Sequence, residues 1–201
     1  MQPTLAWVTN STTIRIALRQ QLRVWRLGRV ATLAGLCLAL GALPGTTGAV
    51  ADGPAVEDLR NRDLEMPVEG VDEGDLRDTF SAARGKRAHA AIDIMAPRHT
   101  PVRAVEDGVI ARAFDSRGAG GLNVYQFDPA GTYCYYYAHL DRYADGMRDG
   151  MKVQRGQVIG YVGTTGNASP NAPHLHFAIF RLTPERLWWK GEPINPYPVL
   201  R

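Results

Sequence analysis

A chain of 201 residues has room for one domain of ordinary size and an additional segment. Its hydrophobic content of 45% and charged content of 21% are those of a globular protein and exclude a disordered chain. The formal charge of +3 comes from the N-terminal part, where five arginines precede the first acidic residue, Asp52. From Asp52 onward, 18 basic residues stand against 20 acidic ones. A nucleic-acid-binding domain carries its basic residues on its folded part, so we expect no nucleic-acid partner.

The first 51 residues have the order of an export signal. An arginine-rich stretch is followed by residues 30–43, which carry no charge, and then by Pro44-Gly45 and the small-x-small sequence Ala49-Val50-Ala51. A helix of that uncharged length spans about 21 Å, less than the ~30 Å core of a bilayer, which favours a cleaved leader over the alternative, an uncleaved anchor. We therefore expect export to the periplasm or the extracellular wall, with membrane contact only through this leader.

Residues 52–78 are acidic and lack a periodic apolar pattern. We interpret them as a linker or an N-terminal wrap, with residues 64–68 as a short extended segment against the main domain. Without a core element in this stretch, deletion of residues 52–63 is expected to leave the fold intact.

From residue 79 to residue 201 the sequence is typical of an all-β domain. Short runs of β-branched and aromatic residues alternate with glycine-containing turns. They predict strands at residues 91–95, 102–105, 109–114, 123–127, 133–139, 158–162 and 175–182, with a short strand and a turn within 150–160. Asp107-Gly108 predicts a hairpin turn, and the one predicted helical turn lies near residues 76–83. Together these elements predict a compact antiparallel sheet or barrel.

Four of the five histidines lie in patterns that suit metal chemistry. His89 precedes Asp93 by four residues, His174 and His176 form an HxH pair, and His139 ends a tyrosine-rich strand. Imidazole and carboxylate are zinc's usual ligands without sulfur, and three of them with one open position make a catalytic site. Residues i and i+2 of a strand share a face, so both His174 and His176 can reach one metal. Residues i and i+4 of a strand are about 13 Å apart, so His89 is expected on a loop before the strand of Asp93.

Other reactive side chains are interpreted as structural. His99 follows Arg98 in an apparent turn and is expected to be a plain surface residue. Glu106 and Asp107 adjoin at the predicted hairpin turn and are expected to be solvated. Cys134 is expected to be a buried strand thiol, because it alternates with tyrosines and lies an odd number of residues from His139.

The motifs between residues 78 and 197 follow one another in a familiar order. They read HAAIDIMAPRHTPVRAVEDGVI at 89–110, YYYAHL at 135–140, VQRGQVIGYVGTTGNASPNAPHLHF at 153–177 and INPYP at 194–198. This stretch of about 120 residues resembles the lysostaphin/LytM family of zinc endopeptidases (peptidase family M23). Ala91 and His99 stand where the family usually has glycine, and a position that needs a positive φ carries a steric cost for either residue.

The resemblance implies one Zn²⁺ per chain, held by His89, Asp93 and His176. It assigns His139 and His174 to catalysis, one as a general base on the attacking water and the other as a stabiliser of the oxyanion. The implied reaction is hydrolysis of the peptide cross-bridges of bacterial peptidoglycan, by a protein that we expect to be a monomer.

Two alternatives remain beside the peptidase. A regulator of the same fold would activate another cell-wall hydrolase, but such proteins usually lack the zinc ligands that this sequence keeps. A lipoyl or biotinyl carrier would share the GMKVQRGQVIG pattern of residues 150–160, but Lys152 is not placed at a hairpin tip as a carrier requires.

Overall fold

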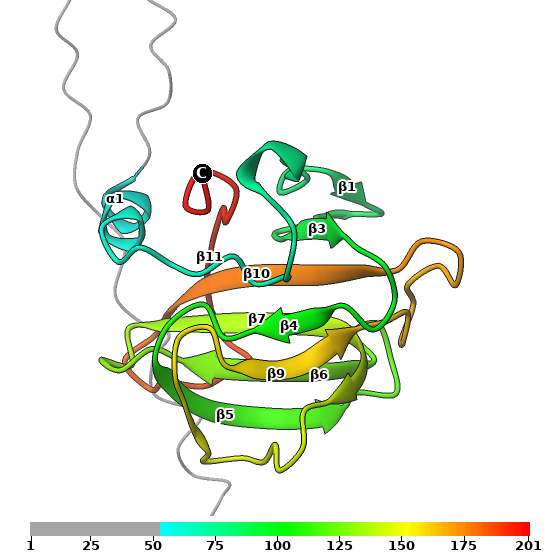
Figure 1. Cartoon of the computed structure of the whole chain (residues 1–201). Helices are drawn as coiled ribbons and strands as arrows, with labels where there is room; N and C mark the ends of the chain where they lie inside the picture. Colours follow the sequence, from blue (N-terminus) through cyan, green and yellow to red (C-terminus); the bar gives the residue numbers. More distant parts are fainter. Residues whose placement is uncertain (1–52) are drawn as a thin grey trace, which may run out of the picture. The chain divides into compact units, whose positions relative to one another are not determined.

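The computed structural model describes residues 53–201, and the expected leader at residues 1–51 lies outside this part (Figure 1). Two short helices come first, α1 (Pro54–Arg60) and the 3-10 helix η1 (Glu73–Asp75). The strands follow in chain order: β1 (Ala83–Arg84), β2 (Arg87–Ala88), β3 (Ile92–Met95), β4 (Pro101–Arg103), β5 (Gly108–Asp115), β6 (Leu122–Phe127), β7 (Tyr133–Tyr143), β8 (Lys152–Val153), β9 (Val158–Val162), β10 (His174–Leu182) and β11 (Gly191–Ile194). None of the helices in residues 53–201 has the length and apolar character that a membrane crossing needs.

A nine-stranded antiparallel sheet forms most of the domain, which confirms the predicted all-β class. Its main path runs β11-β10-β7-β6-β5-β8, with β3 paired to β10 and β4 paired to β9. The long strand β7 pairs with β10 up to Ala138 and with β9 from Leu140. His139 lies between these two partners and has a positive φ of 62°. The change of partner at His139 lets the sheet curl, so that β4 and β9 lie across β6 and β7 (Figure 1).

Alternation along β7 sends three tyrosines into the core. The side chains of Tyr133, Tyr135 and Tyr137 are almost completely buried. Buried hydroxyls need partners, and Tyr137 donates to Oε1 of Gln126 over 2.8 Å while accepting from the backbone N–H of Val105 over 3.1 Å. The tyrosine-rich run is therefore a core strand whose polar ends are satisfied inside the domain.

The segment before the sheet departs from the sequence-based expectation. Pro54 starts α1 at a position where a missing N–H costs nothing, and Val56 and Leu59 join the hydrophobic core. Arg60 donates from Nε to the carbonyl of Pro198 over 2.6 Å, so α1 lies beside the C-terminal residues (Figure 1). The helical turn expected at residues 76–83 is wrong: η1 ends at Asp75, and Leu76 is extended and buried.

The hairpin expected at Asp107-Gly108 is also wrong. Strand β4 pairs with β9, whereas β5 pairs with β6 and β8. Gly108 has no positive φ, and a Cβ atom there would lie 2.1 Å from the carbonyl oxygen of Phe127. The glycine therefore allows close approach of β6 and does not form a two-residue turn.

Candidate metal and catalytic site

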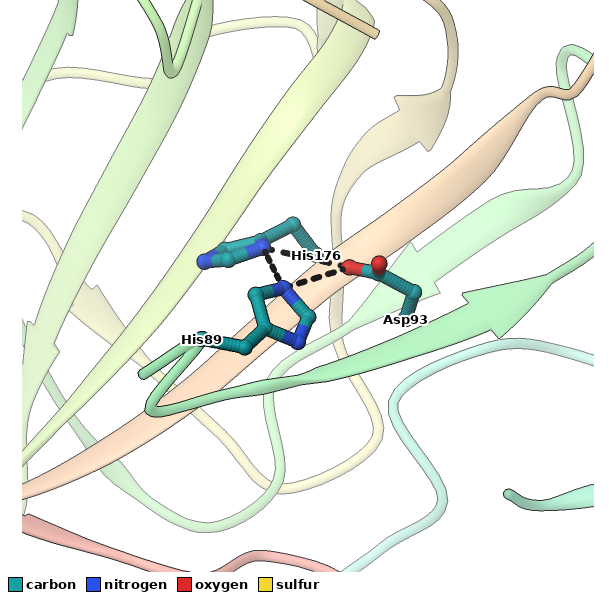
Figure 2. A group of neighbouring side chains, drawn as sticks. All are labelled: His89, Asp93 and His176. Carbon is teal, nitrogen blue, oxygen red and sulfur yellow. Dashed lines mark hydrogen bonds and ion pairs between the residues drawn. The ribbon is translucent and has the colours of Figure 1, made fainter. Parts of the chain in front are cut away.

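Three side chains from two separate parts of the chain converge on one point (Figure 2). His89 Nε2 lies 3.1 Å from Asp93 Oδ1 and 3.0 Å from His176 Nδ1, and His176 Nδ1 lies 3.2 Å from the same carboxylate oxygen. Ligand atoms around one tetrahedral zinc ion, each about 2.0–2.2 Å from it, are roughly 3.3–3.6 Å apart. The three side chains form a group that could hold a metal ion, and their spacing fits zinc within about half an ångström.

Two strands and one loop position these atoms. Asp93 on β3 is directly opposite His176 on β10 in the antiparallel ladder, and such pairs have neighbouring side chains. His89 lies outside β3, on the loop that enters it, as the strand geometry predicted. Ala90 carries a positive φ of 57° in this loop, which turns the chain between His89 and the strand.

Thr79 holds His89 and the backbone of Asp93 in place. Its carbonyl lies 3.1 Å from His89 Nδ1, and its Oγ1 accepts from the backbone N–H of Asp93 over 3.1 Å. With the Nδ1–H of His89 donated to this carbonyl, Nε2 is left free to bind a metal. Thr79 is thus a supporting residue that the sequence analysis missed, since a threonine in a turn carries no distinguishing pattern.

Burial and neighbouring groups shift the pKa values of His89 and Asp93. Burial lowers the pKa of His89, which favours the neutral imidazole. Burial alone would raise the pKa of the Asp93 carboxyl, but the hydrogen bond with His176 and the electrostatic interaction with His89, His176 and His174 outweigh it and lower that pKa. Both shifts favour the neutral imidazole of His89 and the ionised carboxylate of Asp93, the forms that zinc requires.

His139 and His174 lie beside this group. The ring centroid of His139 is 4.9 Å from that of His174 and 5.6 Å from that of His176, and His174 Nε2 is 3.7 Å from Asp93 Oδ1. His139 Nδ1 is 2.8 Å from the carbonyl of Thr165, and His174 Nδ1 is 2.8 Å from that of Ala172. Burial lowers the pKa of His139 to about 4, so its ring is neutral at pH 7. The neutral His139 ring, when it donates through Nδ1 to the carbonyl of Thr165, keeps an unprotonated Nε2.

The four histidines of the site and Asp93 line a cavity of about 770 Å³. Its lining is drawn from β1 and β2, the loop before β6, strands β3, β7 and β10, and the loop before β10: Arg84, Arg87, Ala88, His89, Asp93, Ala119, Gly120, Tyr136, His139, Asn167, Ala168, Ser169, His174 and His176. Tyr136 was not singled out from the sequence, where it is one of several tyrosines. It faces opposite to its buried neighbours on β7 and lies 5.9 Å from His176 between ring centroids.

The structure separates the remaining reactive residues from this cavity. His99 is exposed, as expected, and its Nδ1 lies 3.1 Å from Asp141 Oδ2. Cys134 is a buried strand thiol, and burial raises its pKa far above the ordinary value. The expectation for Glu106 is wrong, because its half-buried carboxylate contacts the Tyr135 hydroxyl and Arg62. Asp107 is exposed.

A fold of this kind, with two histidines and an aspartate at one point and two more histidines beside them, defines a metallohydrolase type of site. A profile of peptidase family M23 matches residues 87–196. This is more than half of the chain, and the chain belongs to peptidase family M23. The resemblance to lysostaphin/LytM-type enzymes is thereby confirmed.

Similar proteins support the assignment. The chain is 35% identical over 133 residues to an L-Ala–D-Glu endopeptidase of Bacillus subtilis (strain 168), covering 62% of this chain and 39% of that protein. It is 38% identical over 113 residues to the DD-carboxypeptidase/endopeptidase Mpg of Neisseria meningitidis serogroup B, covering 56% of this chain and 23% of that protein. The catalytic domain of lysostaphin from Staphylococcus simulans superposes with a TM-score of 0.51 at 26% identity, over 72% of this chain and 96% of that domain. The chain thus matches under half of the length of these two curated relatives.

Proposed function

We propose that this chain is a zinc-dependent endopeptidase that hydrolyses peptide bonds in the cross-bridges of bacterial peptidoglycan. The observation that carries the proposal is the convergence of His89, Asp93 and His176 at mutual distances of 3.0–3.2 Å. Membership of peptidase family M23 supports it. So do the names of its relatives, which include an L-Ala–D-Glu endopeptidase and a glycyl-glycine endopeptidase.

Each residue of the site has a distinct task in this proposal. His89, Asp93 and His176 would hold Zn²⁺, which supplies Lewis-acid polarisation of the scissile carbonyl and lowers the pKa of a bound water. His139 and His174 each place Nδ1 against a backbone carbonyl. This contact leaves the Nε2 atom of either ring available to take the proton of the attacking water. The protonated ring can then donate to the leaving amine, and the other histidine stabilises the charge that develops on the carbonyl oxygen.

The place of action follows from the same proposal. A peptidoglycan substrate lies outside the cytoplasm, and the order of residues 1–51 is that of an export signal. We therefore assign the mature protein to the periplasm or the cell wall. N-terminal sequencing of protein recovered outside the cytoplasm is expected to begin at Asp52, and recovery of the intact chain in the membrane fraction would favour an anchor.

Substitution of the site histidines tests the assignment of roles. His176→Ala removes one of three protein ligands, so the purified protein is expected to lose most of its zinc and its activity. His174→Ala and His139→Ala are expected to keep about one zinc per chain while turnover falls about 10²–10⁴-fold, the usual contribution of a positioned acid or base. Elemental analysis and mass analysis of the peptides released from purified sacculi measure both properties.

The control is His99→Asn, which alters an exposed histidine at a positive φ that asparagine tolerates. It is expected to leave zinc content and turnover unchanged. Loss of zinc from the His174 variant with retention in the His176 variant would reverse the assignment. A wild-type protein that binds zinc and releases no peptide from sacculi would favour the alternative, a regulator of another hydrolase.

A further inference from the structure

A cationic hairpin lies at the rim of the site cavity. Strands β1 and β2 pair Ala83 with Ala88 and Arg84 with Arg87, and Gly85-Lys86 forms the two-residue turn between them. Gly85 has a positive φ of 63°, which such a turn requires and glycine adopts freely. The sequence from Arg84 to Arg87 therefore places three cations within four residues, all of them exposed.

The two arginines of this hairpin face the site together. Residues directly opposite in an antiparallel pair have side chains on the same face. Arg84 shows which face this is, because its Nη2 lies 2.6 Å from Asp93 Oδ2. Arg87 lines the same cavity. Both guanidinium groups are thus presented to the space in which a substrate would lie.

The two opposed arginines carry an electrostatic cost that the folded domain offsets only at Arg84. Like charges directly opposite each other destabilise a two-stranded ribbon, and β1 and β2 have no strand partners except each other. The side chain of Arg84 has Asp93 as a partner, whereas the side chain of Arg87 has neither a hydrogen bond nor an ion pair within residues 53–201. An anion bound from solution would give Arg87 the partner that it lacks.

The rest of the cavity would not repel such an anion. Asp93 is the only carboxylate among the residues that line it. Its Oδ1 faces His89 and His176, and its Oδ2 faces Arg84, so both oxygens are already engaged. The wall formed by Asn167, Ala168 and Ser169 carries no charge.

We propose that the β1–β2 hairpin, through Arg87, binds a carboxylate of the substrate peptide beside the scissile bond. The proposal rests on the peptidase function and narrows its substrate class to peptides with a free carboxyl group near the cleaved bond. A guanidinium fork suits a carboxylate because it donates two parallel hydrogen bonds. Because Arg87 shares a cavity with the proposed catalytic histidines, we assign the anion to the peptide and not to a separate phosphate polymer of the wall.

The test compares two forms of one probe, a synthetic peptidoglycan stem peptide with free carboxyl groups and the same peptide with these groups amidated. Binding of each fluorescently labelled form to the zinc-loaded protein is measured by anisotropy, and cleavage of each is measured as kcat and KM. Arg87→Gln is compared with Arg148→Gln, which removes the same charge from an exposed loop outside the cavity.

The wild type and Arg148→Gln are expected to bind the free-carboxyl peptide about tenfold more tightly than the amidated one, the order of one charge-assisted hydrogen bond. Arg87→Gln is expected to lower this ratio to about threefold or less, mainly through KM, with kcat for the amidated peptide retained.

Three outcomes would overturn the proposal: an unchanged ratio in Arg87→Gln, an equal fall in Arg148→Gln, or tighter binding of the amidated peptide. The same holds if Arg87→Gln weakens binding of purified teichoic acid and leaves the peptide ratio unchanged. Binding without cleavage of either peptide would contradict the peptidase function alone, because the binding ratio still tests the hairpin.

Discussion

In most of the site histidines, a hydrogen-bonding contact with a backbone carbonyl determines which ring nitrogen faces the cavity. His89, His139 and His174 each place Nδ1 within 2.8–3.1 Å of a carbonyl, those of Thr79, Thr165 and Ala172. Their Nε2 atoms are thereby left for the metal or for a proton. His176 differs, since its Nδ1 faces Asp93 and His89. For His89, His139 and His174, the backbone carbonyl behind the ring thus determines which nitrogen is available for chemistry.

Three non-glycine residues that bear on the site or on the sequence expectations have positive φ angles. Ala90, His99 and His139 have φ values of 57°, 72° and 62°, and such conformations cost on the order of 1–3 kcal/mol each. The expected cost at His99 is therefore present. At the other position in question, Ala91 is buried without a positive φ, and its neighbour Ala90 takes the strained conformation. Two of these strained positions bear on the site. Ala90 turns the chain directly after His89, and His139 lies where β7 changes partner from β10 to β9.

Glu106 gives a prediction about the dependence of stability on pH. Burial raises the pKa of its carboxyl, against the opposing effects of the Tyr135 hydroxyl and Arg62. The folded state therefore binds this proton more tightly than the unfolded state does. The resulting stability is fully present below the unfolded pKa of about 4.3 and is lost as pH rises through the higher folded pKa.

Glu106→Gln removes this pH-dependent loss of stability, because glutamine stays neutral at every pH. The free energy of unfolding of the variant, relative to the wild type, is expected to increase between about pH 4 and about pH 7. Urea denaturation at both values measures the difference. A variant that becomes relatively less stable at the higher pH would show that the ion pair with Arg62, 3.3 Å away, outweighs the cost of burial.

At the scale of elements, the period-2 pattern predicted the strands that form the centre of the sheet. Strands β3, β5, β6, β7, β9 and β10 lie within a few residues of the predicted ranges. The same periodicity placed His174 and His176 on one face, and the distance along a strand placed His89 on a loop. These predictions succeeded because alternation and rise per residue are local properties of a strand.

The elements that were missed depend on contacts distant in sequence. Strands β1 and β2 have two residues each, too few for a pattern, and β11 contains Pro193, which disfavours strand assignment. The Asp107-Gly108 pattern predicted that β4 and β5 pair with each other. Instead β4 pairs with β9, and β5 pairs with β6 and β8, because the packing of the whole sheet sets these partners. The contacts of Thr79 and Arg84 with the ligands likewise arise only when the hairpin folds over β3.

Helix α1 provides a test of the N-terminal segment. Leu59 is completely buried in the core cluster, so Leu59→Ala is expected to reduce the free energy of unfolding by about 2–5 kcal/mol. Deletion of residues 52–63 is expected to destabilise the domain for the same reason, contrary to the expectation from sequence. Chemical denaturation of both variants measures the loss.

The matched control is Glu57→Ala, an exposed position two residues earlier in the same helix. Its effect is expected to lie within about 0.5 kcal/mol of zero, as for most surface substitutions. A Leu59 variant as stable as the control would show that α1 is a removable wrap.

At the scale of the whole molecule, the proposed metal links two parts of the chain that are far apart in sequence. His89 and Asp93 come from the hairpin-to-β3 region, and His176 lies 83 residues after Asp93. In the unfolded chain these groups are far apart, so metal binding favours the folded state over the unfolded state. A ligand that binds only the folded state stabilises it by about 4 kcal/mol when its free concentration is a thousand times Kd.

Removal of the metal is therefore expected to lower Tm as well as to abolish activity. A loss of about 4 kcal/mol corresponds to a fall in Tm on the order of 10 °C for a domain of this size. Differential scanning calorimetry with and without a chelator measures the shift, and added Zn²⁺ is expected to restore the original Tm. In His176→Ala, which lacks one ligand, the chelator is expected to have little effect. Equal Tm values for the wild type with and without chelator would contradict a metal bound by His89, Asp93 and His176, since any ion held by all three must stabilise the fold that brings them together.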